Sequence, residues 1–293
     1  MREQRKVNII LDSTREQVSP GFFIRRSLPL AALKMLDPFL LIDHMGPVNL
    51  LPGEGQGVPD HPHRGFQTIT YILSGAIEHK DSQGNKEVIG PGDIQWMTAG
   101  EGIVHSEMME ESFREAGGTL HGFQIWVNLP KAHKLTPAGY QMRRSTDIPI
   151  WKSKDSKAIV KVIAGKHAGV SARIDTFTPI MFLHVTVQPG AEISIEIPAD
   201  YLACVYGIEG AGEIGSENLV IKGGQIAPLS ETGNYITLQV PDSFTAPLDV
   251  LVLGGIPLKE TVASYGPFVM NTSREIMQAI EDYQNGKMGR IKN

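Results

Sequence analysis

Four side chains of the types that bind metal ions bracket the stretch from Asp60 to Glu107. His61 and His63 stand at one end, His105 and Glu107 stand at the other, and each pair is spaced i, i+2. Side chains i and i+2 leave the same face of a β-strand, so each pair on a strand would direct both members toward one point. β-Branched residues, glycines and a Pro-Gly-Asp turn lie between the pairs. We therefore expect a sheet that curls into a barrel, with both pairs meeting inside it.

The candidate ligands form a set of three imidazoles and one carboxylate. Such a donor set suits Fe(II), and it also suits Mn, Co, Ni, Cu or Zn. An octahedral ion held by four protein ligands keeps two positions open for O2 or a bidentate substrate, whereas a closed structural zinc site keeps none. Spacing alone leaves one alternative, in which His61-Pro-His63 is merely a turn and His105 is unrelated to it.

We interpret the other histidines as structural or exposed. His44 stands alone in an apolar run, without a second candidate ligand at strand spacing, and this favours a buried structural role. The acidic residues near His79 favour exposure on a hairpin. His121 is expected at the mouth of a strand, with a role in a pocket as the alternative. His184 fits a core or interface histidine.

Composition and charge exclude several functional classes. The net charge of −5 over 293 residues argues against binding nucleic acid through bulk electrostatics. No stretch approaches the roughly 20 apolar residues of a membrane span, and the first residues contain no apolar run of signal-peptide length. The single cysteine, Cys204, excludes an internal disulfide and fits a reducing compartment. We expect a cytoplasmic monomer.

Turn residues predict an all-β fold of two antiparallel β-barrels. The 31 glycines and 19 prolines separate short β-rich runs. A faint repeat matches residues 90–94 (GPGDI) with residues 222–226 (KGGQI), and the second copy lacks a ligand set. The polar, proline-broken segment 131–157 is the expected connector. We predict a metal-binding domain at 1–133 and a second barrel without metal ligands at 134–293.

The C-terminal region predicts one short helix. Thr272 and Glu275 have the spacing of a capping box, and Gly286 is placed to end the helix. Apolar residues that would pack against a barrel follow at helical intervals, at Ile276, Met277, Ile280 and Tyr283.

The motifs resemble those of the pirin family of the cupin superfamily. The resemblance rests on HPHRGFQTITYILSG and GDIQWMTAGEGIVHSEM, on the flanking LDPFLLIDHMGP and LHGFQIWVNLP, and on the tail SREIMQAIEDYQNGK. It implies a bicupin with one metal in the N-terminal barrel, bound by His61, His63, His105 and Glu107. Pirins commonly have Glu where this chain has Gln67, so we expect altered hydrogen bonding around the metal.

The resemblance also implies an activity and its alternatives. Several pirins are quercetin 2,3-dioxygenases, which implies a flavonol and O2 as substrates, Fe(II) as cofactor and carbon monoxide as a product. Glu107, or a nearby base, would accept the proton of the 3-hydroxyl. The second reading is a non-catalytic, metal-dependent regulator that acts through a protein partner, as a transcriptional co-regulator or an enzyme modulator. A third reading is a cupin oxygenase with an unrelated substrate.

Overall fold

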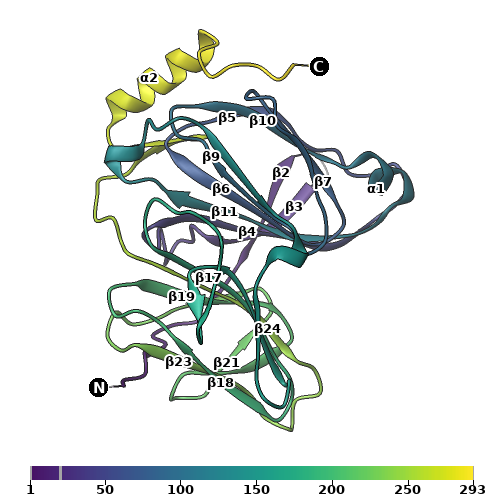
Figure 1. Cartoon of the computed structure of the whole chain (residues 1–293), viewed down its shortest axis with the longest axis vertical. Helices are drawn as coiled ribbons and strands as arrows, with labels where there is room; N and C mark the ends of the chain where they lie inside the picture. Colours follow the sequence, from purple (N-terminus) through teal and green to yellow (C-terminus); the bar gives the residue numbers. More distant parts are fainter. Residues whose placement is uncertain (1, 20–21, 293) are drawn as a thin grey trace. The chain divides into compact units, whose positions relative to one another are not determined.

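The computed structural model describes residues 2–19 and 22–292, and its chain forms two compact units (Figure 1). Neither unit is one continuous stretch. The unit that carries the candidate ligands, here called the site unit, combines Arg15–Pro29, Pro38–Ser145 and Leu258–Asn293. The second unit combines Met1–Thr14, Leu30–Asp37 and Thr146–Pro257. The division into folding domains 1–133 and 134–293 stays a prediction.

The site unit consists of two sheets that share an apolar core. Its larger sheet holds seven strands, in spatial order β12 (Gly139–Arg143), β9 (Ile94–Thr98), β6 (Phe66–Ser74), β11 (Gly118–Asn128), β4 (Phe39–Leu50), β3 (Phe22–Leu28) and β2 (Thr14–Ser19). Its smaller sheet holds four, in spatial order β5 (Gly57–His63), β10 (Ile103–Met109), β7 (Ile77–Asp81) and β8 (Lys86–Ile89). Ile72 and Leu120 from the larger sheet pack with Ile77 and Met109 from the smaller one. The two sheets therefore face each other as a jelly roll.

The second unit repeats this architecture with an apolar interior. Its larger sheet runs β1 (Leu11–Asp12), β22 (Gln225–Pro228), β19 (Leu202–Glu209), β24 (Leu248–Gly255), β17 (Ile180–Val187), β14 (Ala158–Ala164) and β13 (Ile150–Lys152). Its smaller sheet runs β18 (Ala191–Glu196), β23 (Tyr235–Val240), β20 (Ala211–Ile214) and β21 (Leu219–Lys222). Val185, Val205 and Leu238 belong to one core that both sheets supply. Among its described residues, this unit holds no cluster of three metal-binding side chains.

Short elements connect or cover these sheets. They are the helix α1 (Glu111–Ala116), 3-10 turns at Lys131–His133 and Ser145–Asp147, the hairpin β15 (Lys166–His167) with β16 (Val170–Ser171), and the hairpin β25 (Ala263–Tyr265) with β26 (Phe268–Met270). The expected connector 131–157 is thus partly ordered into strands β12 and β13. No helix in the described part of the chain is long and apolar enough to cross a membrane.

The C-terminal helix α2 (Ser273–Gln284) begins where the capping motif predicts. The Thr272 side chain accepts a hydrogen bond from the Glu275 backbone N–H at 3.2 Å, and Gly286 follows the helix with a φ of 73°. Ile276 is buried, but Met277 is 71% exposed, so only part of the predicted apolar stripe packs. The all-β fold with a short C-terminal helix is confirmed, and its barrels are open two-sheet jelly rolls rather than closed cylinders.

Candidate metal centre

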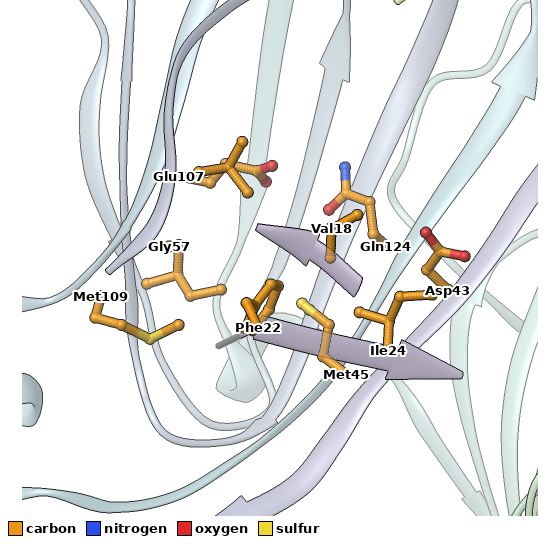
Figure 2. A pocket seen from close by; sticks show the side chains of 11 residues that line it. Val18, Phe22, Ile24, Asp43, Met45, Gly57, Glu107, Met109 and Gln124 are labelled. Atoms are coloured by element: carbon orange, nitrogen blue, oxygen red, sulfur yellow. The ribbon is translucent and has the colours of Figure 1, made fainter. Parts of the chain in front are cut away.

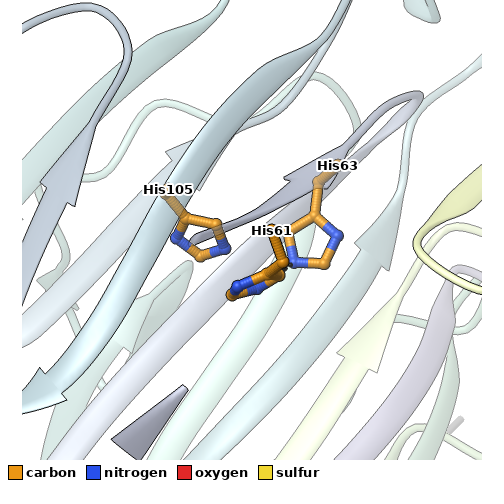
Figure 3. Close-up of side chains that lie close together, drawn as sticks. All are labelled: His61, His63 and His105. Carbon is orange, nitrogen blue, oxygen red and sulfur yellow. Dashed lines mark hydrogen bonds between the residues drawn. The ribbon is translucent and has the colours of Figure 1, made fainter. Parts of the chain in front are cut away.

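Three of the four predicted ligands converge inside the site unit. His61 and His63 lie on β5 and His105 lies opposite His61 on the antiparallel neighbour β10. One nitrogen from each imidazole lies within 4.8 Å of the corresponding atoms of the other two. Figure 3 shows the three rings gathered around one point. The i, i+2 spacing and the pairing of two adjacent strands together produce this arrangement.

The hydrogen bonds of His61 and His63 fix which ring nitrogens are free. His61 Nδ1 lies 2.8 Å from the Pro59 carbonyl oxygen, and His63 Nδ1 lies 3.3 Å from that of Pro267. A carbonyl oxygen only accepts hydrogen bonds, so each neutral ring carries its proton on Nδ1 and a lone pair on Nε2. The two Nε2 atoms are 3.1 Å apart. Two lone pairs at this distance repel each other unless a cation binds them both.

His105 supplies a third free nitrogen. Its side chain is fully buried, and neither ring nitrogen has a hydrogen-bond partner among the residues that the structure describes. Burial, followed by the neighbouring His63, holds the pKa of His105 well below its usual value. A buried imidazole without a partner is costly, and metal coordination removes that cost. The three converging imidazoles therefore fit a bound metal ion.

Glu107 is not part of this three-imidazole group. The pairing of β10 with β5 shifts between His105 and Glu107 because β5 has one extra residue there, whereas β10 pairs regularly with β7. His105 and Glu107 therefore keep their i, i+2 relation on one face of β10. Its Oε1 accepts a hydrogen bond from Thr70 Oγ1 at 2.8 Å. Its carboxylate borders a cavity with Met109 and Gln124 (Figure 2). Its role as fourth ligand or as base stays a prediction.

Thr70 links Glu107 to a second polar side chain. Thr70 Oγ1 lies 2.8 Å from Glu107 Oε1 and 2.9 Å from Gln124 Oε1. A hydroxyl carries one proton and can donate to only one of these acceptors. With the Gln124 amide rotated by 180°, its NH2 group donates to Thr70 and Thr70 donates to Glu107. This series of hydrogen bonds, from Gln124 through Thr70 to Glu107, holds the carboxylate at the edge of the cavity.

The exposed position predicted for His79 is wrong. His79 is fully buried, with Nε2 3.1 Å from Asp81 Oδ2 and Nδ1 2.7 Å from Gln95 Nε2. Its ring centroid lies 5.4 Å from that of His105. The alternation of buried Ile77, His79 and Asp81 on β7 could have revealed the inward face, because residues two apart share a side of the strand.

His44 and His184 have structural environments, as expected. His44 is fully buried, stacks on Phe123 at 4.4 Å and places Nε2 2.7 Å from Nε2 of His121. His184 is buried beside Asp249, with Nε2 2.9 Å from the carboxylate. The partner of His44 lies 77 residues away in sequence, which explains why no local pattern indicated it.

Gln67, the departure from the family pattern, is buried on β6. Its Nε2 donates a hydrogen bond to Thr98 Oγ1 on β9 at 2.8 Å. Because an amide both donates and accepts, it can make this bond without a charge. The effect of Gln67 on the metal stays a prediction.

Burial of neutral histidines predicts a loss of stability in acid. Burial lowers the pKa of both His44 and His63 to about 3, whereas an unfolded histidine titrates near 6.5. Between these values the unfolded chain binds protons that the folded chain does not, so the free energy of unfolding falls as pH falls. Each such group contributes a slope of about 1.4 kcal/mol per pH unit.

We therefore expect the melting temperature of the metal-free protein, measured by calorimetry, to fall steadily from pH 6.5 to pH 4. His44→Phe removes one of these groups and retains a ring that can stack on Phe123. The variant should show a shallower acid slope than the wild type. An unchanged slope would show that His44 is not kept neutral by the fold.

Family models match both halves of the chain. The model described as Pirin matches residues 21–127, and the model described as Pirin C-terminal cupin domain matches residues 182–289. The chain belongs to the pirin family. The first match spans all three clustered histidines of this pirin, and the second spans most of its apolar jelly roll. The resemblance noted in the sequence is confirmed.

Relatives match over nearly the full length of the chain. A pirin-like protein of Solanum lycopersicum is 42% identical over 270 residues, which cover 92% of this chain and 88% of the relative. The pirin of Homo sapiens is 38% identical, with coverage of 99% and 96%. The crystal structure of a quercetin 2,3-dioxygenase from Acinetobacter baumannii is 37% identical, with a TM-score of 0.92 and coverage of 99% and 100%.

Proposed function

We propose that this pirin is a metal-dependent dioxygenase that opens the heterocyclic ring of quercetin-like flavonols. The observation that carries the proposal is the group of three imidazoles, two of them buried, whose ring nitrogens converge within 4.8 Å of one another. The similarity to a structure described as a quercetin 2,3-dioxygenase supports the substrate class. The reaction consumes one O2 and releases one ring carbon as carbon monoxide.

The three imidazoles would bind the metal ion, and the residues beside them would accept a proton from the substrate. An ion bound by His61, His63 and His105 would supply a redox-active centre with open positions for a substrate oxygen and O2. Glu107 would accept the proton of the 3-hydroxyl, and Thr70 would hold its carboxylate in position. Fe(II) is our proposed metal, with Mn, Co, Ni, Cu and Zn as alternatives that the donor set also suits.

The cavity beside Glu107 sets a condition on this activity. Its walls include the apolar side chains of Phe22, Met45 and Met109, and its volume is about 70 Å³. Pockets that enclose drug-sized ligands usually measure roughly 300–1,000 Å³. A flavonol therefore requires these side chains to move, and methionines adapt readily because their unbranched chains rotate.

The tight cavity also favours a second candidate function. A protein whose cavity beside Glu107 is too small for a flavonol could act as a non-catalytic regulator that binds a protein partner in a metal-dependent manner. The two functions require the same imidazoles, so the ligand set does not distinguish them.

Turnover separates the two candidates. The metal-free protein is reloaded with Fe(II) and mixed with quercetin under air, while flavonol absorbance and carbon monoxide are followed. The dioxygenase proposal predicts loss of quercetin with one carbon monoxide released per molecule consumed. Absence of turnover with iron and with every other first-row metal that binds would contradict it and favour the regulator.

A further inference from the structure

We propose that the C-terminal segment, residues 258–292, is a working part of the metal centre that positions His63 and His105. Arg64 and Asp282 are the positioning residues, because their ion pair attaches this segment to the end of β5. This inference rests on the proposed metal site and deepens it. It explains why a segment more than 150 residues beyond the last predicted ligand belongs to the site unit.

The segment supplies the hydrogen-bond partner of one imidazole. The Pro267 carbonyl oxygen lies 3.3 Å from His63 Nδ1 and also accepts the backbone N–H of Arg64 at 3.4 Å. Such a carbonyl fixes both the tautomer and the orientation of a metal-binding imidazole. His63 Nε2 therefore points toward His61 only while the segment stays docked.

Arg64, the residue after His63, binds the segment through both its backbone and its side chain. Its carbonyl oxygen accepts the backbone N–H of Val269 at 3.0 Å, which joins it to β26. Its guanidinium donates to Asp282 Oδ2 on α2 at 2.8 Å and to the Glu101 carbonyl oxygen at 2.6 Å. Arg64 is 7% exposed, so this ion pair is largely shielded from solvent. Loss of either charge would leave the other poorly compensated.

The backbone of Gly65, the residue after Arg64, lies unusually close to the backbone of Val269 on β26. Gly65 has a φ of +87°, and a Cβ at this position would lie 2.0 Å from the Val269 carbonyl oxygen. The buried ammonium of Lys134 donates to the carbonyl oxygens of Gly65 and Val269 at 2.7 and 2.8 Å. Glycine and lysine thus hold β26 against the end of β5.

The same segment supports the strand that carries His105. Val104, the preceding residue, packs in an apolar cluster with Phe268, Met270 and Ile276. Ser82 accepts the backbone N–H of Val104 and donates to the Met288 carbonyl oxygen at 2.9 Å. The segment therefore contacts the chain neighbours of two imidazoles, one on each ligand strand.

Asp282 offers a variant with a matched control. One carboxylate oxygen binds the buried Arg64, and the other binds Lys287 Nζ at 2.8 Å. The Lys287 side chain is 60% exposed, and its ion pair is on the surface. Asp282→Asn removes the charge that pairs with Arg64. Lys287→Met removes only the surface partner of the same carboxylate. Asp282→Glu tests rescue by a longer carboxylate.

Titration of the metal-free full-length chain with Co(II) measures the effect, because the visible spectrum of Co(II) reports its coordination. Loss of an orienting partner typically weakens metal affinity about 10–100-fold. We expect Asp282→Asn to weaken Co(II) affinity at least about tenfold and to alter the spectrum, with Lys287→Met within about twofold of the wild type and partial recovery in Asp282→Glu. Circular dichroism checks that each variant is folded.

If folded Asp282→Asn binds Co(II) as tightly as the wild type, the positioning role is wrong while the metal site stands. If the wild type itself binds no Co(II) or other divalent metal, the proposed metal site and this inference both fall. Should Asp282→Asn not fold, Ser82→Ala removes one hydroxyl on the His105 side. We then expect a severalfold weaker Co(II) affinity, and an unchanged affinity would overturn the proposal.

Discussion

His105→Ala is expected to abolish metal binding and flavonol turnover while leaving the fold intact. The change removes one of three converging imidazoles and leaves only His61 and His63, which are adjacent on one strand. We expect metal affinity to fall by more than about 100-fold, because even loss of an orienting neighbour costs 10–100-fold. Metal content after dialysis and quercetin turnover measure the two losses.

The stability of this variant gives an independent check. Both ring nitrogens of His105 lack hydrogen-bond partners in the described part of the chain, so alanine removes no such bond from the metal-free protein. Metal should raise the melting temperature of the wild type, because it binds the folded state, and should not raise that of the variant.

His184→Ala is the matched control, since it removes a buried histidine that pairs with Asp249 in the second unit. It should lower the melting temperature and leave the metal content unchanged. One equivalent of tightly bound metal in His105→Ala would contradict the assignment of the centre.

Glu107→Gln is expected to lower kcat by about 100-fold or more, as loss of a general base typically does. Glutamine has nearly the same shape and keeps an oxygen that can accept the hydrogen bond from Thr70, so the cavity wall is preserved. It cannot take up the proton of a flavonol hydroxyl. Steady-state kinetics at saturating quercetin, with metal content determined for the same samples, separate loss of the base from loss of metal.

Thr70 variants test how the carboxylate is held. Thr70→Val removes the hydroxyl at nearly constant volume, whereas Thr70→Ser keeps it. We expect Thr70→Val to lower kcat severalfold and Thr70→Ser to stay near the wild type.

A Glu107→Gln variant with full metal and wild-type turnover would show that another group accepts the proton.

The clustered histidines were predictable because strand geometry makes spacing informative. His61 and His63, two residues apart, had to share a face, and pairing of neighbouring strands brings His105 opposite His61. The same rule places Glu107 on the face of β10 that carries His105, and the regular pairing of β10 with β7 agrees with it. Spacing along one strand does not show which side chains of other strands a residue meets, so the hydrogen bond of Glu107 to Thr70 required the structure.

Other features depend on contacts between distant parts of the chain. Pro267 lies 204 residues from His63, and no local pattern could indicate that its carbonyl oxygen orients this imidazole. The C-terminal helix was predicted from its cap and its apolar spacing, yet it groups with the site unit rather than with the sheets that precede it in sequence. The acidic neighbours of His79 indicate exposure, whereas the alternation of Ile77, His79 and Asp81 along β7 places this histidine on the buried face.

Anomalous diffraction from crystals of the iron-loaded protein tests the central claim most directly. Data collected on either side of the iron absorption edge locate the ion without assuming its ligands. We predict one peak in the site unit, within coordination distance of one nitrogen of each of His61, His63 and His105. A crystal with iron bound elsewhere, or with no peak among these three imidazoles, would contradict the account.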